Sequence, residues 1–367
     1  MQLKQVSRDA LLKPLQAVSG IVERRQTLPI LANVLLEQKN GRLFVTATDL
    51  EMQITANSEL ASKQEQAVTV GARKLQDLLR ALPEDSSLNV DTAAGKMTVR
   101  AGRSRFNLQT LPAADYPRIG LSQEQQQTIA LPQRDFRGLL KLAEFAMAQQ
   151  DIRYYLNGML LVIDKGSLQA VATDGHRLSY ASIAVTGNYS KQEVILPRKT
   201  VLELGKLLED SDAELTIDLL TNQVRFRFSN IELVSKVVDG KFPDYNRVIP
   251  SGHSKQLDLS RAELLQALQR AAILSNEKFR GVRLVLGPDQ LKIICTNSEQ
   301  EEAEEELEIA YKGEPLDIGF NITYLLDVLH NLAADRVVLA LGDANSSALI
   351  TMPERGDYKY VVMPMRI

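Results

Sequence analysis

The stretch Leu168-Gln169-Ala170-Val171-Ala172-Thr173-Asp174, an apolar run that ends in Thr-Asp, recurs in similar form at two other places in the chain. Residues 43–47 precede Thr48-Asp49, and residues 291–295 precede Thr296-Asn297. Position 174 follows position 49 by 125 residues, and position 297 follows position 174 by 123. Self-similarity at a nearly constant step is the sequence signature of tandem structural units.

Two further landmarks keep nearly the same step. Leucines and valines at helical spacing lie within 75–82, 201–208 and 325–332, with steps of 126 and 124 residues. Asn33, Gly158 and Gly281 each open an apolar, strand-like run, with steps of 125 and 123. We therefore expect three copies of one unit, with domains at 1–126, 127–253 and 254–367.

Each copy shows the pattern of a helix, strands, a second helix and further strands, which indicates an α+β protein. The first helix is expected around residues 10–12, 136–140 and 264–268, the last of these after Ser260 with Glu263 at capping-box spacing. Alternating strands are expected at 88–90, 97–99, 215–217, 224–228 and 337–341. Arg225 and Arg227 alternate with apolar residues, which predicts a solvated strand face.

Length, composition and charge exclude several classes of protein. A chain of 367 residues is too long for one ordinary core, and 44% hydrophobic with 24% charged residues is typical of a globular protein. No apolar run approaches the roughly 18 residues of a membrane span, and the first residues lack a secretory signal pattern. We expect a cytoplasmic protein without a membrane partner. The net charge of −3 means that any nucleic-acid affinity must come from local patches.

The sequence offers little for catalysis. Phosphate-binding glycine loops and the H-E-x-x-H helix motif of zinc proteases are missing, and His176, His253 and His330 lie far apart. We expect no metal site, no cofactor, and a buried, inert thiol at Cys295. Ser275 and Lys278 match the S-x-x-K of serine β-lactamases, but the companion motifs are absent. A serine hydrolase that uses these two residues is kept as an alternative.

Several longer segments resemble the bacterial DNA polymerase III β subunit family, the sliding clamps. The resemblance covers the whole chain and rests on segments at 28–31 (LPIL), 48–52 (TDLEM), 110–117 (TLPAADYP), 151–159 (DIRYYLNGM), 172–178 (ATDGHRL), 239–245 (DGKFPDY), 272–283 (AILSNEKFRGVR) and 360–367 (YVVMPMRI).

The resemblance implies a fold of three tandem clamp units, each with two helices backed by antiparallel sheets, and a ring of two chains joined head to tail. It implies a non-enzymatic processivity factor that encircles double-stranded DNA. The implied partners are the replicative DNA polymerase catalytic subunit, the clamp-loader complex, and other polymerases and repair proteins that carry clamp-binding peptides. An acidic interaction scaffold that does not encircle DNA is the competing interpretation.

The resemblance also implies three sets of site residues. Those expected to contact DNA are Arg25, Arg73, Gln150, Tyr154 and Tyr155, with Arg24 as the alternative to Arg25. Those expected to form an apolar pocket for short peptides containing glutamine, leucine and phenylalanine are Leu156, Thr173, Gly175, His176, Arg177, Leu178, Pro243, Arg247, Val248, Val361, Met363, Pro364, Met365, Arg366 and Ile367. The terminus alone is also compatible with a buried last strand, and His176 alone with a general base.

The third set concerns the joint between chains. Seven glutamates lie between Glu299 and Glu308, a run that by itself indicates a solvated face, and basic residues lie beside Phe106 and Leu108 in the first unit. By resemblance these surfaces meet, with Phe106 and Leu108 packing against Ile273 and Leu274. The residues expected at the joint are Arg103, Arg105, Phe106, Leu108, Ile273, Leu274, Glu299, Glu301, Glu302, Glu304 and Glu305.

Overall fold

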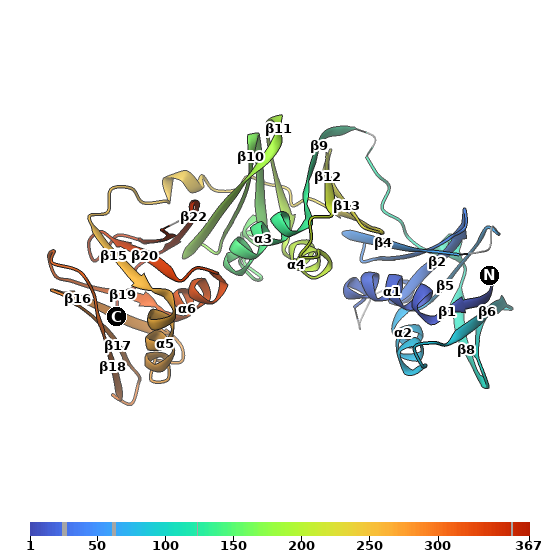
Figure 1. Ribbon diagram of the computed structural model, residues 1–367, viewed down its shortest axis with the longest axis horizontal. Helices are drawn as coiled ribbons and strands as arrows, with labels where there is room; N and C mark the ends of the chain where they lie inside the picture. The colour runs from blue at the N-terminus through green and yellow to red at the C-terminus, as the bar shows by residue number, and fades with distance from the viewer. Residues whose placement is uncertain (24–27, 61–63, 123, 354) are drawn as a thin grey trace. The chain divides into compact units, whose positions relative to one another are not determined.

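The structure is a computed structural model that describes residues 1–23, 28–60, 64–122, 124–353 and 355–367. The described residues form six α-helices (Figure 1), which are α1 (Arg8–Val18), α2 (Ala72–Ala81), α3 (Gln133–Ala143), α4 (Arg198–Leu207), α5 (Arg261–Ala272) and α6 (Ile322–Asn331). All six lie where the spacing of apolar residues predicted a helix, so the predicted pair of helices in each third of the chain is confirmed.

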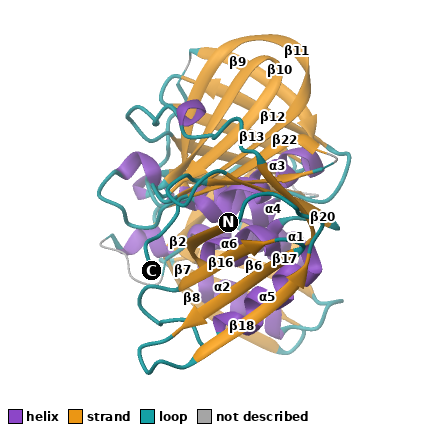
Figure 2. Ribbon diagram, turned by 90° about the vertical axis from the view of Figure 1, so that its left-hand side faces the viewer, coloured by secondary structure: helices purple, strands orange, loops and turns teal. Residues whose placement is uncertain are grey.

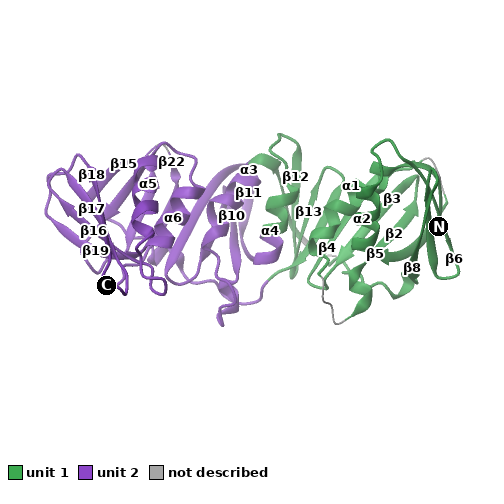
Figure 3. Ribbon diagram, turned by 90° about the horizontal axis from the view of Figure 1, so that it is seen from below, with its two compact units in different colours: residues 1–134, 202–237 green, residues 135–201, 238–367 purple. Residues whose placement is uncertain are grey.

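The chain divides into two compact units (Figure 3). Unit 1 comprises residues 1–134 and 202–237, and unit 2 comprises residues 135–201 and 238–367. The middle third of the sequence is therefore shared between the two units. Two of the three divisions fall within α3 and within α4, and the third follows Val237.

Unit 1 is built on one 12-stranded sheet. Helix α1 packs against α2 and lies across β3 (Arg42–Thr48) and β4 (Met52–Glu59) (Figure 1). In spatial order the strands are β1 (Gln2–Ser7), β6 (Ser87–Ala93), β7 (Lys96–Ala101), β8 (Ser104–Leu111), β5 (Gln66–Gly71), β2 (Asn33–Lys39), β3 (Arg42–Thr48), β4 (Met52–Glu59), β14 (Ile231–Lys236), β13 (Gln223–Phe228), β12 (Glu214–Leu220) and β9 (Gln125–Pro132).

Unit 2 contains two sheets. Helix α5 packs against α6 and lies against the strands β17 and β18 of the smaller sheet (Figure 2). The six-stranded sheet has the order β10 (Gly158–Thr173), β11 (Arg177–Pro197), β22 (Arg355–Val362), β21 (Ala348–Met352), β20 (Arg336–Leu341) and β15 (Lys255–Ser260), and the four-stranded sheet has the order β18 (Glu302–Glu308), β17 (Gln290–Thr296), β16 (Gly281–Gly287) and β19 (Leu316–Asn321).

The repeat landmarks coincide with element boundaries. The strands β2, β10 and β16 begin at Asn33, Gly158 and Gly281. Local capping explains several helix starts, because a side-chain oxygen satisfies a backbone N–H that has no partner within the helix. The predicted cap at Ser260 is confirmed, since its hydroxyl accepts from the Glu263 N–H at 3.4 Å. Asn321 caps α6 in a similar way, accepting from Thr323.

The sheets continue across the boundaries between repeats. In unit 1, β4 of the first repeat pairs antiparallel with β14 of the second, with Ile54 opposite Leu233. In unit 2, β11 of the second repeat pairs antiparallel with β22 of the third, with Ser179 opposite Tyr360. Each junction therefore joins a strand from the first half of one repeat to the last strand of the next repeat.

The expected solvated face is confirmed at Arg227, whose side chain is 47% exposed, and is wrong at Arg225, whose side chain is 20% exposed. Both guanidinium groups donate from Nε to Asp218, at 2.8 and 3.2 Å, and the Asp218 side chain is completely buried. Thr128 also donates to this carboxylate, at 2.8 Å. A buried carboxylate must be paired and hydrogen-bonded, so these arginines serve the interior of the sheet.

Candidate functional site

The turn that links β10 to β11 carries four of the predicted pocket residues. The Thr173 hydroxyl donates to the Arg177 carbonyl at 2.6 Å and accepts from the Gly175 N–H at 3.1 Å. The Asp174 carboxylate accepts from the N–H groups of His176 and Arg177, at 2.9 and 3.1 Å. These short-range bonds hold the turn rigid and place His176 at its tip.

The first repeat forms the same turn with different side chains. Thr48 donates to the Met52 carbonyl at 2.9 Å, and Asp49 accepts from the N–H groups of Glu51 and Met52 at 3.0 and 2.8 Å. Leu50, with φ of 76°, occupies the left-handed position that Gly175 takes at 90°. The turn is therefore a property of the repeat, and the absence of a side chain at Gly175 is a property of the second copy.

Apolar side chains lie beneath the second-repeat turn. Leu156, Leu178 and Val361 are buried in one cluster with Phe242 and Val171. The segment that follows Phe242 leaves Pro243, Arg247 and Val248 exposed, and Arg247 pairs with Asp244 at 3.2 Å. The structure thus brings the predicted pocket residues of the second repeat together with the end of β22.

The chain terminus runs on from β22 along this surface. The Met363 N–H donates to the His176 carbonyl at 2.9 Å, and the Met365 N–H donates to the Gly319 carbonyl at 2.8 Å. A β-carbon added at Gly319 would lie 2.7 Å from Ile367 Cδ1, so the terminus lies directly on the backbone of β19. Val361 is a buried strand residue, whereas Met363, Arg366 and Ile367 are exposed and Pro364 and Met365 are half-buried. The expected buried last strand is therefore confirmed at Val361, while Met363, Arg366 and Ile367 are accessible at the surface.

The predicted DNA-contacting residues lie in two places. Gln150, Tyr154 and Tyr155 belong to a loop and short 3₁₀ helix before β10, with Tyr154 more than half exposed and the two rings in edge contact at 5.8 Å. Arg73 lies in the first turn of α2, exposed, with Nη2 donating to the Val22 carbonyl at 3.3 Å. Arg25, like its alternative Arg24, lies outside the described residues.

Arg153, which the sequence did not single out, shapes this loop. It donates from Nε and Nη2 to the Asp151 carboxylate at 3.0 and 2.8 Å, and from Nη2 to the Asp174 carbonyl at 3.2 Å. These bonds lower the pKa of Asp151 to about 2, and His176 adds a smaller effect. Only the folded chain brings the loop and the turn together, so spacing in the sequence carried no signal for this role.

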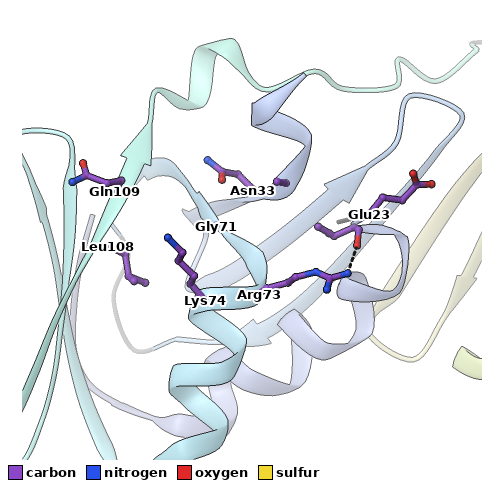
Figure 4. Close-up of a pocket in the computed structure, with 9 residues that line it drawn as sticks. Glu23, Asn33, Gly71, Arg73, Lys74, Leu108 and Gln109 are labelled. Atoms are coloured by element: carbon purple, nitrogen blue, oxygen red, sulfur yellow. Dashed lines mark hydrogen bonds between the residues drawn. The ribbon is translucent and has the colours of Figure 1, made fainter. Parts of the chain in front are cut away.

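Strand β8 in unit 1 borders a cavity of about 360 Å³ (Figure 4). Residues 104–109 of β8 pair with β7 on one side, while the pairing with β5 involves Thr110 and Leu111. Phe106 and Leu108 are half-buried, Arg105 is exposed, and Arg103 lies in the exposed turn before the strand. The cavity is lined by Val22, Glu23, Ala32, Asn33, Gly71, Arg73, Lys74, Leu108 and Gln109.

Strand β18 in unit 2 carries the acidic run. Its residues alternate between exposed and half-buried positions, with Glu302 and Glu304 on the exposed face and Glu305 half-buried. Glu299 and Glu301 lie exposed in the turn before it. Glu304 accepts from Lys292 Nζ at 2.7 Å. Glu305 pairs with Arg270 at 2.6 Å, which lowers the pKa of this carboxyl. Beside this strand, at the end of α5, Ile273 is 78% exposed and Leu274 is half-buried.

Comparison with known proteins gives a consistent result along the whole chain. Models for the DNA polymerase III β subunit match residues 1–120 (N-terminal domain), 130–244 (central domain) and 246–366 (C-terminal domain). The chain belongs to the DNA polymerase III β subunit family. It is 48% identical over 364 residues to the β sliding clamp of Pseudomonas putida, covering 99% of both proteins.

Solved structures of this family share the fold. The crystal structure of the DNA polymerase III β subunit from Pseudomonas aeruginosa matches with a TM-score of 0.97 and 47% identity, covering 100% of both chains. A sliding clamp from the same organism, bound to griselimycin, matches with a TM-score of 0.96 and 47% identity over the same share of both chains. The predicted fold of three tandem clamp units, with helices backed by antiparallel sheets, is confirmed.

Sliding clamps are non-catalytic processivity factors that bind DNA and DNA polymerase, and the chain functions as a DNA sliding clamp. This sets aside the alternatives of a serine hydrolase and of a scaffold. Ser275 itself is buried, and its hydroxyl donates to the Ala272 carbonyl at 2.8 Å. Burial raises the pKa of the Cys295 thiol to about 11, which agrees with an inert side chain.

Two features are absent from the described residues. Within 1–23, 28–60, 64–122, 124–353 and 355–367, no group of three or more His, Cys, Asp or Glu side chains is placed to hold a metal ion. In the same part of the chain, no helix is long and apolar enough to cross a membrane.

Proposed function

We propose that two copies of this chain join head to tail into a ring around double-stranded DNA, and that each copy offers one pocket to peptides of its partners. The domains of each copy are 1–126, 127–253 and 254–367. The partners are the replicative DNA polymerase catalytic subunit, the clamp-loader complex, and other polymerases and repair proteins with clamp-binding peptides. The proposed location is the cytoplasm.

The observation that carries the ring is the pair of internal junctions. The pairings β4 with β14 and β11 with β22 each use one edge strand from either side of a repeat boundary. A third pairing of the same kind needs β18 of one copy and β8 of another. In the described residues, β18 is the outer strand of its sheet, and residues 104–109 of β8 have a strand on one side alone. Heterologous contacts of this kind close a ring when the rotation per unit allows it.

The junction between β4 and β14 also supplies the register. Strands β8 and β14 each follow a two-residue turn, which the pairs Ala101–Ser104 and Phe228–Ile231 close. Phe106 is the third residue of β8, and Leu233 is the third residue of β14. On the other side of the joint, Ile54 comes directly after Gln53, which pairs with Thr48 at the end of β3. In the same way, Ala303 comes directly after Glu302, which pairs with Thr296 at the end of β17. Because Leu233 lies opposite Ile54, Phe106 of one copy lies opposite Ala303 of the other.

This register places matching side chains together. Phe106 and Ala303 are both half-buried, so their inward faces agree. The next pair is Arg105 opposite Glu304, both on the exposed face. Opposite charges directly across an antiparallel pair are stabilising, and Arg103 lies near the same acidic edge. Glu304 has Lys292 as a neighbour within its own chain, so the joint adds a second cation to an existing pair.

Apolar contact at the joint comes from the end of α5. Ile273 is largely exposed within its own chain, and the cavity beside Leu108 in unit 1 is lined partly by apolar atoms (Figure 4). We place Ile273 and Leu274 of one copy against Phe106 and Leu108 of the other. Burial of such side chains supplies most of the free energy of association in obligate interfaces.

The DNA-contacting residues proposed for the ring are Arg25, Arg73, Gln150, Tyr154 and Tyr155. A net charge of −3 supports weak, local phosphate contact, because a clamp must slide on the duplex that it encloses. Retention on DNA then depends on closure of the ring and not on the strength of the contacts.

The partner pocket is formed by the β10–β11 turn, the buried cluster beneath it and the chain terminus. Its members are Leu156, Thr173, Gly175, His176, Arg177, Leu178, Pro243, Arg247, Val248, Val361, Met363, Pro364, Met365, Arg366 and Ile367. Exposed Met363 beside buried apolar residues suits a surface that adapts to several peptides. His176 is a wall of this pocket. The P. aeruginosa clamp bound to griselimycin supports ligand binding in this family.

The test of the ring uses topology. The protein is loaded by a clamp loader onto nicked circular plasmid, and gel filtration at raised salt then separates bound from free protein. A closed ring stays on the circle at a salt concentration that removes electrostatic binders, and it leaves after the plasmid is cut to a linear form. Retention that is unchanged by linearisation would contradict the proposal.

A further inference from the structure

We propose that Asp327, on α6 of the third repeat, is a positioning residue for the peptide pocket and acts through Arg177 of the second repeat. The inference rests on the proposed peptide-binding function and assigns a role to a residue outside the pocket. Both residues belong to unit 2. They lie 150 residues apart in the chain, and Arg177 Nη1 donates to Asp327 Oδ2 at 2.6 Å.

The Arg177 side chain is turned away from the pocket surface. It is only 10% exposed, and Nε donates to Asp174 at 3.0 Å while Nη2 donates to the Phe145 carbonyl at 2.7 Å. The guanidinium also lies 4.5 Å from the centre of the Tyr324 ring, within the range of a cation–π contact. Each nitrogen of this guanidinium already has an acceptor within the chain, so Arg177 is not a charge offered to a bound peptide.

The bonds of Arg177 lead to the pocket in three steps. Asp327 fixes the guanidinium, and the guanidinium fixes the Asp174 carboxylate. Asp174 in turn accepts from the backbone of His176 and Arg177, and the His176 carbonyl accepts from the N–H of Met363. Asp327 therefore orients the turn through the Arg177 side chain, and through the turn it orients the start of the terminal segment.

The first repeat shows that the turn does not need this ionic chain in order to fold. There the position of Arg177 is taken by Met52, which is buried, and the backbone bonds of the turn are the same. The sixth residue of α4 in unit 1, Glu203, corresponds to Asp327 as the sixth residue of α6, and it pairs with Lys206 on its own helix. The link between helix and turn is thus confined to the repeat junction that carries the pocket.

The contact is of a strong kind. Charge-assisted hydrogen bonds in sites with restricted access to water are stronger than neutral ones, and a guanidinium that loses one carboxylate is left partly uncompensated. The Asp327→Asn variant keeps the shape of the side chain and removes the charge. We expect peptide affinity to fall about tenfold, which corresponds to about 1.4 kcal/mol.

The experiment is a double-mutant cycle on the full-length protein. Asp327→Asn, Arg177→Met and the double variant are titrated calorimetrically with a Gln-Leu-x-Leu-Phe peptide, where methionine is the residue that the first repeat uses. If Asp327 acts through Arg177, the Asp327→Asn change weakens binding in the wild-type background and has no effect in the Arg177→Met background. Asp327→Glu, which keeps the charge, restores part of the affinity.

A matched control tests whether loss of any ion pair has this effect. Asp258 on β15 pairs with Arg336 at 2.8 Å in the same unit, so Asp258→Asn removes the carboxylate of a more exposed ion pair elsewhere. This control should bind the peptide as the wild type does. An equal loss in both backgrounds, or no loss in Asp327→Asn, would overturn the inference.

Hydrogen exchange separates this inference from the proposed pocket. The amides of Arg177 and Met363 are bonded to Asp174 and to the His176 carbonyl, so Asp327→Asn should speed their exchange without any peptide. A wild-type protein that does not bind the peptide would refute the pocket, and the exchange rates would still decide whether Asp327 holds the turn. Unchanged exchange in Asp327→Asn would refute the positioning role.

Discussion

The guanidinium of Arg153 lies directly against Gly175, so that a β-carbon added to Gly175 would be 2.8 Å from Arg153 Nη2. Gly175 also has a φ of 90°, a conformation that side chains disfavour. The left-handed turn itself tolerates a side chain, because Leu50 occupies the corresponding position in the first repeat. A side chain at position 175 would therefore displace the Arg153 guanidinium from its present place.

The first prediction follows from this contact. Gly175→Ala should lower the free energy of unfolding by about 1 kcal/mol, the usual cost of a left-handed alanine, and should weaken peptide binding because Arg153 must move. Gly95→Ala is the matched control, since Gly95 has a φ of 71° and nothing within 4 Å of an added β-carbon. It should show the same cost in thermal unfolding with unchanged peptide affinity. Equal affinities for the two variants would contradict the prediction.

The second prediction concerns apolar contact at the joint. Replacing Ile273 and Leu274 with alanine should convert the dimer into folded monomers, at a cost of about 2–5 kcal/mol for each side chain that the joint buries fully. Light scattering coupled to size exclusion measures the mass, and circular dichroism confirms folding. Ile152→Ala is the control, because Ile152 is 96% exposed in the loop before β10 and is not among the residues proposed for the joint. A dimer that persists in the double variant would show that the joint lies elsewhere.

The third prediction tests the strand register at the joint. Arg105→Glu places a second carboxylate opposite Glu304, and like charges directly across a strand pair are destabilising. The dissociation constant of the dimer should rise severalfold. Adding Glu304→Arg reverses the charge pair, and it should bring the dissociation constant part of the way back to the wild-type value. Sedimentation velocity over a range of concentrations measures both constants. Failure of the second change to compensate the first would argue against Arg105 opposite Glu304.

The fourth prediction concerns the terminal segment. Deleting Met363 to Ile367 should abolish binding of the Gln-Leu-x-Leu-Phe peptide while the dimer persists, because the pocket loses one apolar wall. Deleting Arg366 and Ile367 alone retains the Met363 and Met365 bonds to His176 and Gly319, and should leave part of the affinity. Calorimetric titration distinguishes the two truncations. Full affinity after the longer deletion would move the pocket away from the terminus.

The fifth prediction concerns pH. Hydrogen bonds from Arg153 lower the pKa of Asp151 to about 2, against a usual value of 3.8. A carboxylate with a lowered pKa in the folded state contributes stability that is present above 3.8 and is lost as the pH falls through about 2. Carbon-detected NMR of labelled aspartate should therefore show Asp151 ionised at pH 3.5. In Arg153→Gln its midpoint should rise toward 3.8, and a wild-type midpoint already near 3.8 would refute the pairing.

Much of the fold and part of the candidate site follow from the sequence by itself. The spacing of Asn33, Gly158 and Gly281 located the start of one strand in each repeat, and Ser260 with Glu263 located a helix start. These features depend on side-chain periodicity and on hydrogen bonds between near neighbours, which short stretches of sequence contain in full. The Thr-Asp turns belong to the same class, because their bonds span no more than four residues.

Only the tertiary structure decided which charged residues meet. The alternation around Arg225 and Arg227 indicated a solvated face, yet both reach the buried Asp218 because β12 and β13 are paired in that register. Arg177 was expected in the pocket wall, and packing of α6 near the β10–β11 turn directs it inward to Asp327. A long, flexible charged side chain takes its partner from the elements packed around it, and sheet register and helix packing bring those elements together from distant parts of the chain.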